Sequence, residues 1–290
     1  MIGHDGTVSD TTDHHTPRSR KYRYRLTTSD GVGIDAVLLR GAEPRTTAVV
    51  LANGFTGSHQ NPHTRVIAEG LMPVGDVMTF DFRGHHGSDG RSTLGNAEIH
   101  DLEAIVGRLR ELGYHRIATV GFSMGAAVAI RHAAIYGGSA AVVAVSGPSR
   151  WYYQGTRAMR VLHLGIGKTL GRAFLRRFRK VRVIDEDWNP TPAEPRELAG
   201  RVAPAPLLVV HGDSDDYFPV THATAIYDAA RQPKDLWIIP GMGHAERAVE
   251  PDLVVRMRAW LDERLGGTER RDGQQEAPDG HGANRGEEGV

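Results

Sequence analysis

A serine lies at the centre of a tight five-residue pattern, Gly121-Phe122-Ser123-Met124-Gly125. A β-like apolar run, residues 116–121, leads into it, and a helix-like run, residues 124–136, follows it. So tight a strand-to-helix turn needs small residues two positions before and two positions after the serine. The turn would lift the Ser123 hydroxyl above the edge of a sheet, where free N–H groups of the helix favour a developing negative charge. The pattern is typical of a serine nucleophile.

A serine hydroxyl is a weak nucleophile unless a histidine accepts its proton and an acid orients that histidine. Both partner types follow later apolar runs of the chain. The candidates are Asp213, Asp215 and Asp216 after residues 206–212, and His244 after residues 235–240. Because the carboxyl ends of parallel strands meet at one edge of a sheet, we expect Ser123, one of these carboxylates and His244 to come together there.

The elements that must position these residues are eight strands and the helices between them. The strands are expected at residues 21–28, 33–41, 47–52, 76–82, 116–121, 140–146, 206–212 and 235–240. The first two flank a Ser-Asp-Gly turn and read as an antiparallel hairpin. The others are near-continuous apolar runs, typical of strands buried on both faces of a parallel sheet. Helical patterns at residues 97–112, 124–136, 220–231 and 251–265 complete an open α/β sheet.

The chain also divides into regions. Residues 1–20 and 266–290 are polar and read as disordered tails, which leaves a core of residues 21–147 and 201–265. Roughly sixty residues separate the sixth and seventh strands, about twice what a crossover helix needs. Residues 148–200 are therefore expected to form an inserted helical cap over the carboxyl ends of the strands.

With these motifs in place, the chain resembles serine hydrolases of the α/β-hydrolase superfamily, in the branch of small esterases, thioesterases and serine-aminopeptidase-like lipases. The family's acid motif H-G-x-x-D-x-x-x-P is matched with Asp215 as its acid, and G-x-G-H is matched with His244. The resemblance therefore selects Asp215, leaves Asp213 to shape the turn and leaves Asp216 exposed. In the family's D-x-R-G-H-G-x-S loop, His86 stands where a Gly is usual.

The resemblance also implies an oxyanion hole made by two backbone N–H groups. One is that of Met124, directly after the nucleophile, and the other is that of Phe55 in Asn53-Gly54-Phe55-Thr56-Gly57. Asn53 replaces the usual His, but the donor is a backbone group and survives the change. The family's fold, an α/β-hydrolase fold with an eight-stranded mostly parallel sheet, helices on both faces and a helical cap insertion, agrees with the elements above.

The function expected from these residues is hydrolysis of a carboxylic ester or thioester through an acyl-Ser123 intermediate. Acyl transfer, amide hydrolysis and C–C bond hydrolysis use the same triad and remain open. A non-catalytic ligand-binding protein on this fold is the alternative from another class, and it has no need of a complete triad. Haloalkane dehalogenases and epoxide hydrolases are excluded, since they carry an Asp at the position of Ser123.

Composition excludes several other classes. The chain has no Cys, so it holds no disulfide, iron–sulfur site or cysteine nucleophile. Histidines lack metal-ligand spacing, and no metal or cofactor is expected. The net charge is zero, which argues against nucleic-acid binding. Residues 1–20 contain no apolar signal region, and no apolar run reaches the roughly 20 residues that span a bilayer. We therefore expect a cytoplasmic protein.

The cap region carries an uneven share of the charge. Residues 148–182 hold ten Lys and Arg residues and no Asp or Glu, so the rest of the chain carries net −10. Apolar residues interleave with these cations and predict one or two amphipathic cap helices. A solvated basic face is the plain interpretation. The functional one is an anionic partner at the cap, either an acyl thioester, its carrier or a membrane surface, with Trp151, Tyr152 and Tyr153 walling an acyl pocket.

Overall fold

A central sheet organises residues 20–266, the part of the chain that the computed structural model describes. Its strands are β1 (Arg20–Thr27), β2 (Gly33–Arg40), β3 (Thr47–Ala52), β4 (Asp76–Phe80), β5 (Arg116–Phe122), β6 (Ala141–Val145), β7 (Leu207–Gly212) and β8 (Lys234–Ile239). They lie in the order β1-β2-β4-β3-β5-β6-β7-β8. The β1–β2 and β2–β4 pairs are antiparallel and the other neighbours are parallel. The predicted eight-stranded, mostly parallel sheet is confirmed.

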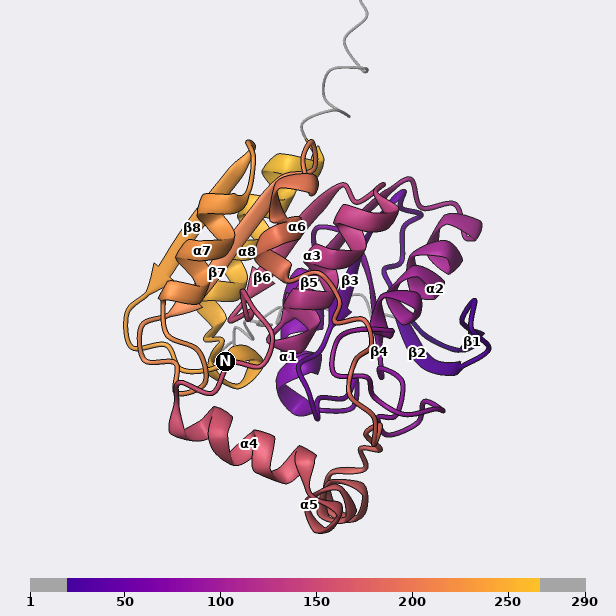
Figure 1. The fold of residues 1–290 in the computed structure, drawn as a ribbon. Helices are drawn as coiled ribbons and strands as arrows, with labels where there is room; N and C mark the ends of the chain where they lie inside the picture. The colour runs from indigo at the N-terminus through magenta and orange to yellow at the C-terminus, as the bar shows by residue number, and fades with distance from the viewer. Residues whose placement is uncertain (1–19, 267–290) are drawn as a thin grey trace, which may run out of the picture.

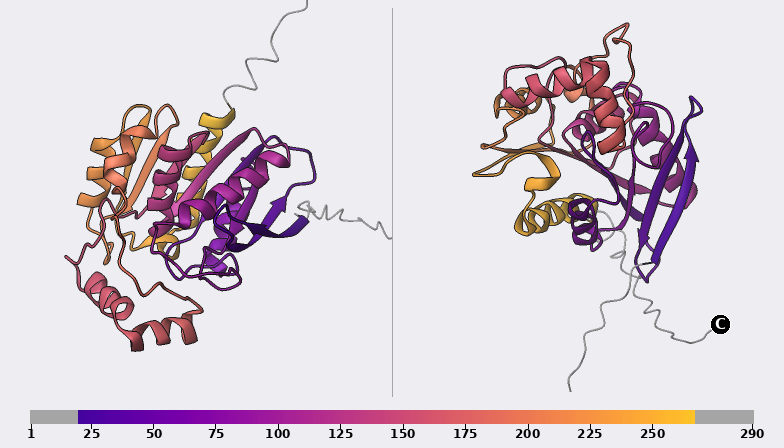
Figure 2. Two further views of the ribbon diagram at one scale, coloured as in Figure 1. Left: turned by 45° about the vertical axis from the view of Figure 1, so that its right-hand side comes forward. Right: turned by 90° about the horizontal axis from the view of Figure 1, so that it is seen from below.

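Helices cover both faces of the sheet (Figures 1 and 2). The core helices are α1 (Pro62–Leu71), α2 (Glu98–Glu111), α3 (Met124–Tyr136), α6 (Pro195–Leu198), α7 (Thr221–Ala229) and α8 (Pro251–Gly266). One face packs against α1 and α8, through residues such as Ile67 and Met257. The other packs against α2, α3 and α7, through residues such as Leu102 and Ile130. Because both faces are covered, the central strands are buried at nearly every position and are mostly apolar, as their sequence indicates.

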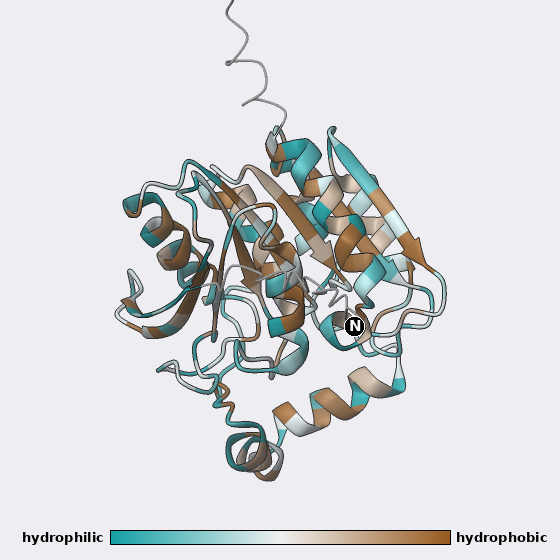
Figure 3. Ribbon diagram, turned by 180° about the vertical axis from the view of Figure 1, so that it is seen from behind, coloured by the Kyte–Doolittle hydropathy of each residue, from teal (hydrophilic) through white to brown (hydrophobic). Residues whose placement is uncertain are grey.

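The segment between β6 and β7 forms helices beyond one end of the core (Figure 1). They are α4 (Arg157–Gly167), α5 (Thr169–Phe174) and a π-helical turn, Leu175–Arg179. Thr156 caps α4, its hydroxyl accepting a hydrogen bond from the Met159 N–H. Apolar and polar residues alternate along α4 (Figure 3). Leaving these helices, the chain runs beside the core, where Val181 and Val183 pair with His85 and Ser92.

The predicted polar tails lie outside the described residues, apart from Arg20 in β1 and Gly266 in α8. Among the helices that are described, none combines the length and apolar character needed to cross a membrane.

Candidate active site

Ser123 sits in the turn between β5 and α3 with a backbone φ of 51° and ψ of −115°. Two glycines make this turn possible. A β-carbon on Gly121 would lie 2.3 Å from the Gly125 carbonyl oxygen, and one on Gly125 would lie 2.1 Å from the Ala52 carbonyl oxygen. Any side chain would therefore force the strand, the turn and β3 apart. The Ser123 N–H donates to the carbonyl of Val145 at the end of β6, which anchors the turn to the sheet.

The sheet brings the three residues selected from the sequence into one chain of hydrogen bonds. The Ser123 hydroxyl lies 2.9 Å from His244 Nε2, and His244 Nδ1 lies 2.8 Å from Asp215 Oδ2. His244 begins the turn after β8, and Asp215 follows β7. Tyr217 stacks on the His244 ring with centroids 4.4 Å apart, which limits the ring's rotation. The serine can thus donate its proton to a histidine whose other nitrogen is held by a carboxylate.

Asp215 and Asp213 have different surroundings. The Asp215 side chain has no exposed surface, and its Oδ1 accepts hydrogen bonds from the Tyr217 and Phe218 N–H groups. Burial raises the pKa of Asp215, but hydrogen bonds and charge attraction from His244 and the two N–H groups outweigh it, so that the pKa is lowered overall. Asp213 Oδ1 instead accepts from the Gly241 N–H and closes the turn. Asp216 is exposed.

His211, at the end of β7, stabilises the loop of residues 213–218, called here the acid loop because it carries Asp215. Its Nε2–H donates to the Phe218 carbonyl oxygen at 2.8 Å. Burial lowers the pKa of His211, so the ring is neutral at neutral pH. The neutral ring leaves His244 as the partner that orders Asp215.

The loop that holds the second expected oxyanion donor is fixed from both sides. Asn53 Oδ1 accepts a hydrogen bond from the Thr64 hydroxyl, and its amide donates to the Phe80 carbonyl. The Thr56 N–H donates to His85 Nε2 at 3.2 Å, while His85 Nδ1 donates to the Arg83 carbonyl. Asn53 therefore ties the loop to α1 and to β4. Phe55 and Met124 both line the cavity that contains Ser123.

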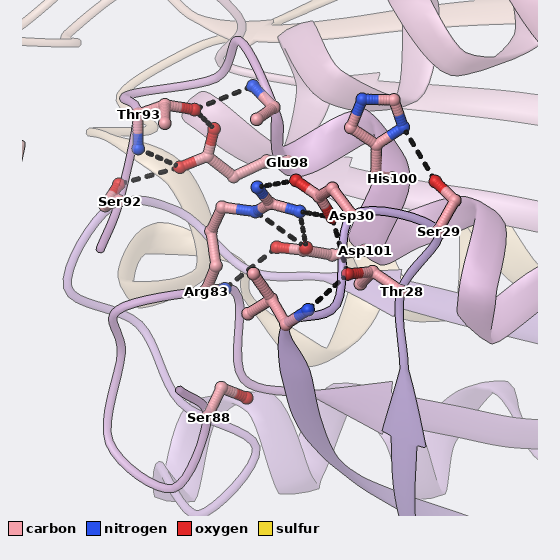
Figure 4. A network of polar contacts seen from close by, with 12 residues as sticks. Thr28, Ser29, Asp30, Arg83, Ser88, Ser92, Thr93, Glu98, His100 and Asp101 are labelled. Atoms are coloured by element: carbon pink, nitrogen blue, oxygen red, sulfur yellow. Dashed lines mark hydrogen bonds and ion pairs between the residues drawn. The ribbon is translucent and has the colours of Figure 1, made fainter. Parts of the chain in front are cut away.

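Behind this loop, Arg83 is buried between two carboxylates (Figure 4). Its Nε donates to Asp101 Oδ1 at 2.8 Å, and its other two nitrogens donate to Asp30 at 2.6 and 2.9 Å. His86, which stands where a glycine is usual, takes a φ of 38°. The backbone at His86 therefore lies in the left-handed region that glycine favours.

A cavity of about 980 Å³ opens onto the triad. Trp151, Tyr152 and Tyr153 line it together with apolar residues of α4 such as Met159 and Leu162. Glu246, which the sequence offers no motif to single out, also lines it. Its only sequence signal is its position two residues after His244.

One cluster among the described residues has metal-ligand types, namely Asp35, His59 and Asp81. His59 Nδ1 lies 3.0 Å from Asp81 Oδ1, whereas Nε2 lies 3.8 Å from Asp35 Oδ2. Because opposite ring nitrogens face the two carboxylates, the geometry is that of an imidazole bridging two acids. A single ion could engage only one of those nitrogens.

Sequence comparisons connect this chain to known hydrolases. A monoacylglycerol lipase of Mycolicibacterium smegmatis is 28% identical over 240 residues, covering 68% of this chain and 80% of that protein. An uncharacterized protein of Mycobacterium tuberculosis, Rv2307c, is 28% identical over 209 residues, and the match spans 62% of its length.

Structural comparisons agree. The Pyrococcus furiosus esterase Pf2001 superposes with a TM-score of 0.67 at 25% identity, covering 86% of this chain and 91% of that one. The α/β hydrolase GrgF of Penicillium sp. superposes with a TM-score of 0.68 at 19% identity, covering 85% and 99%. The model of the alpha/beta hydrolase family matches residues 49–257. The chain belongs to the alpha/beta hydrolase family.

Proposed function

We propose that the protein is a serine hydrolase that cleaves a carboxylic ester or thioester. The observation that carries this proposal is the hydrogen-bonded chain Ser123–His244–Asp215, with distances of 2.9 and 2.8 Å, at the floor of a large cavity. The esterase and lipase among the similar proteins support the ester class. The absence of a Cys among all residues leaves Ser123 as the nucleophile of the turn.

In acylation, Ser123 Oγ forms a bond to the carbonyl carbon while its proton passes to His244 Nε2. The tetrahedral intermediate breaks its bond to the leaving oxygen or sulfur, which takes the proton from Nε2. A water molecule then attacks the acyl carbon and gives a proton to Nε2, and the bond to Ser123 Oγ breaks as that proton returns to the serine. Asp215 stabilises the imidazolium in both half-reactions.

The Phe55 and Met124 N–H groups would hold the oxyanion. Neither backbone N–H donates a hydrogen bond to another described residue, which leaves both for a ligand. Met124 is the first residue of α3, so its N–H is among the groups that a helix cannot satisfy internally. Loss of one such donor costs roughly a hundred- to a thousandfold in rate.

The charged and apolar residues exposed on the cap favour binding of an anionic partner. Besides the ten cations of residues 148–182, the cap exposes apolar side chains: Val161, Leu164, Leu170, Phe174 and Phe178 are 55–85% exposed. Exposed apolar residues interleaved with cations favour the surface of an anionic membrane over a soluble carrier. The partner proposed for the cap is therefore such a surface.

The Ser123→Ala variant tests the chemistry. Alanine fits the turn, so the fold should persist, while hydrolysis of p-nitrophenyl esters and labelling by a fluorophosphonate probe should both disappear. A panel of esters and thioesters of graded acyl length defines the substrate. Retention of most activity by Ser123→Ala would contradict the mechanism, and an unlabelled wild-type protein would favour a binding function.

A further inference from the structure

Glu246 is a buried carboxylate beside the nucleophile that the mechanism above does not use. It lies in the 3₁₀ turn Ala245–Ala248, two residues after His244, and is 8% exposed. A β-carbon on Gly54 would lie 3.2 Å from Glu246 Oε2 and 3.3 Å from Ser123 Cβ, and one on Gly57 would lie 3.1 Å from Glu246 Oε1. The carboxylate thus lies against residues 53–57, called here the oxyanion loop because it holds the Phe55 N–H. Gly54 lies between the carboxylate and Ser123.

This carboxylate has no partner among residues 20–266. No N–H or O–H group there donates a hydrogen bond to it, and no cationic side chain forms an ion pair with it. Two other charges on the cavity wall have partners: Asp185 pairs with Arg91 and Arg172, and Arg179 donates to the Thr56 hydroxyl. Glu186 and Asp187 also line the cavity, but they are exposed to solvent, whereas Glu246 is buried. Glu246 therefore faces the cavity with its charge uncompensated.

An uncompensated buried carboxylate is costly, and it opposes the negative charge that develops on the oxyanion nearby. A positive charge on the bound substrate would relieve both effects. His244 must reach the leaving-group atom, so the leaving group lies near the His244 ring, and Glu246 lies in the 3₁₀ turn that His244 precedes. We propose that Glu246 is a specificity residue that selects esters whose alcohol carries an ammonium group.

This inference rests on the proposed ester hydrolysis and names its leaving group. It predicts discrimination between the esters of two alcohols of the same shape, choline and 3,3-dimethylbutanol. Choline has a positively charged nitrogen where 3,3-dimethylbutanol has a neutral carbon. The wild-type protein should hydrolyse butyrylcholine with a higher kcat/KM than 3,3-dimethylbutyl butyrate. An anionic thioester such as butyryl coenzyme A should be the poorest of the three.

The Glu246→Gln variant removes the charge and keeps the shape of the side chain. The ratio of kcat/KM for the choline ester to that for the neutral ester should fall at least about tenfold, because one member of a close charge pair is lost. The neutral ester should react as fast or faster, since repulsion of the oxyanion is removed. Glu250→Gln, an exposed position of the same segment outside the cavity, should leave the ratio unchanged.

An equal loss on both esters would show that Glu246 only shapes the oxyanion loop, and an unchanged ratio, or a wild-type ratio of one or less, would overturn the proposal. Calorimetric binding of choline to the Ser123→Ala variant gives a readout that needs no turnover. Binding that weakens with Glu246→Gln added supports the assignment even if ester hydrolysis fails. Absence of choline binding, with neutral esters still hydrolysed, rejects the assignment and leaves the hydrolase proposal intact.

Discussion

At the scale of single residues, the loop after β7 contains two carboxylates to which we assign different roles. Asp215 is buried against His244, and Asp213 closes the turn through the Gly241 N–H. Asp215→Asn should lower kcat about 10⁴-fold, because a neutral amide no longer fixes the histidine tautomer or stabilises the imidazolium. Asp213→Asn should reduce kcat far less. Steady-state kinetics on a p-nitrophenyl ester measures both, and the reverse ranking would assign the acid to Asp213.

The residues of the proposed triad, which the structure joins by hydrogen bonds, could be selected from the sequence because each follows a mostly apolar strand in a local motif. The glycines on either side of Ser123 indicate a tight turn directly, and His244 follows the last strand. Separating Asp215 from Asp213 required the resemblance, since both follow the same strand. Glu246 could not be found this way, because its burial depends on the loop around Gly54, which is distant in sequence.

At the scale of elements, α7 is attached to the start of the cap by one histidine. The Ser149 N–H and hydroxyl lie 2.9 and 3.1 Å from Nδ1 of the buried His222. Because Nδ1 accepts the backbone hydrogen bond, the ring is neutral. Burial, and then the nearby charge of Arg150, lowers the pKa of His222 to about 4.

This contact should make stability depend on pH. The unfolded state binds a proton near pH 6.5 and the folded state only near pH 4, so stability is complete above pH 6.5 and falls as the pH drops toward 4. Between pH 7.5 and pH 5 the wild-type protein should lose about 2 kcal/mol more than His222→Asn, whose amide oxygen can accept the same bond. Urea unfolding at both pH values measures the difference. Equal losses in the two proteins would mean that His222 titrates normally in the fold.

Helix α1 shows where element prediction from the sequence fails. The helices expected from the sequence do not include Pro62–Leu71. Proline suits a first helical position. A β-carbon on Gly70 would lie 2.6 Å from Val254 Cγ1 of α8. This glycine permits close contact between α1 and α8, which are far apart in sequence. A glycine is therefore present because of tertiary packing, which the local sequence does not reveal.

At the scale of the whole molecule, residues 148–182 of the cap hold ten cations and no acidic residue, while the rest of the chain carries net −10. Arg176→Gln together with Arg177→Gln should weaken binding to anionic vesicles about 30-fold, from about 1 kcal/mol for each arginine near the surface. The affinity should also fall with added salt. Vesicle sedimentation with anionic and zwitterionic lipids measures the effect.

The matched control removes two exposed cations from the edge strand β1, outside the cap, through Lys21→Gln and Arg23→Gln. It should change vesicle binding little. Hydrolysis of a soluble p-nitrophenyl ester should be equal in all three proteins, since none of these residues contacts the triad. Equal binding by both double variants would leave the cap charges as a solvated face.

The overall sheet could be predicted because each buried strand is a short run of mostly apolar residues. The strand order could not, since β3 lies between β4 and β5 through contacts that no local pattern encodes. An amphipathic pattern in the sequence predicted the helices of the cap. Their position beyond one end of the core depends on the contacts of the following segment with His85 and Ser92, which the sequence does not reveal.

The hydrogen bond between Ser123 and His244 joins positions 121 residues apart, on opposite sides of the cap insertion. During synthesis, the nucleophile, its glycine turn and the cap leave the ribosome before the acid and the base exist. A chain that has reached only the end of the cap carries a serine with no proton acceptor. The proposed mechanism requires β7 to pair with β6 and β8 to pair with β7, so the catalytic activity proposed here would report that this half of the sheet has assembled.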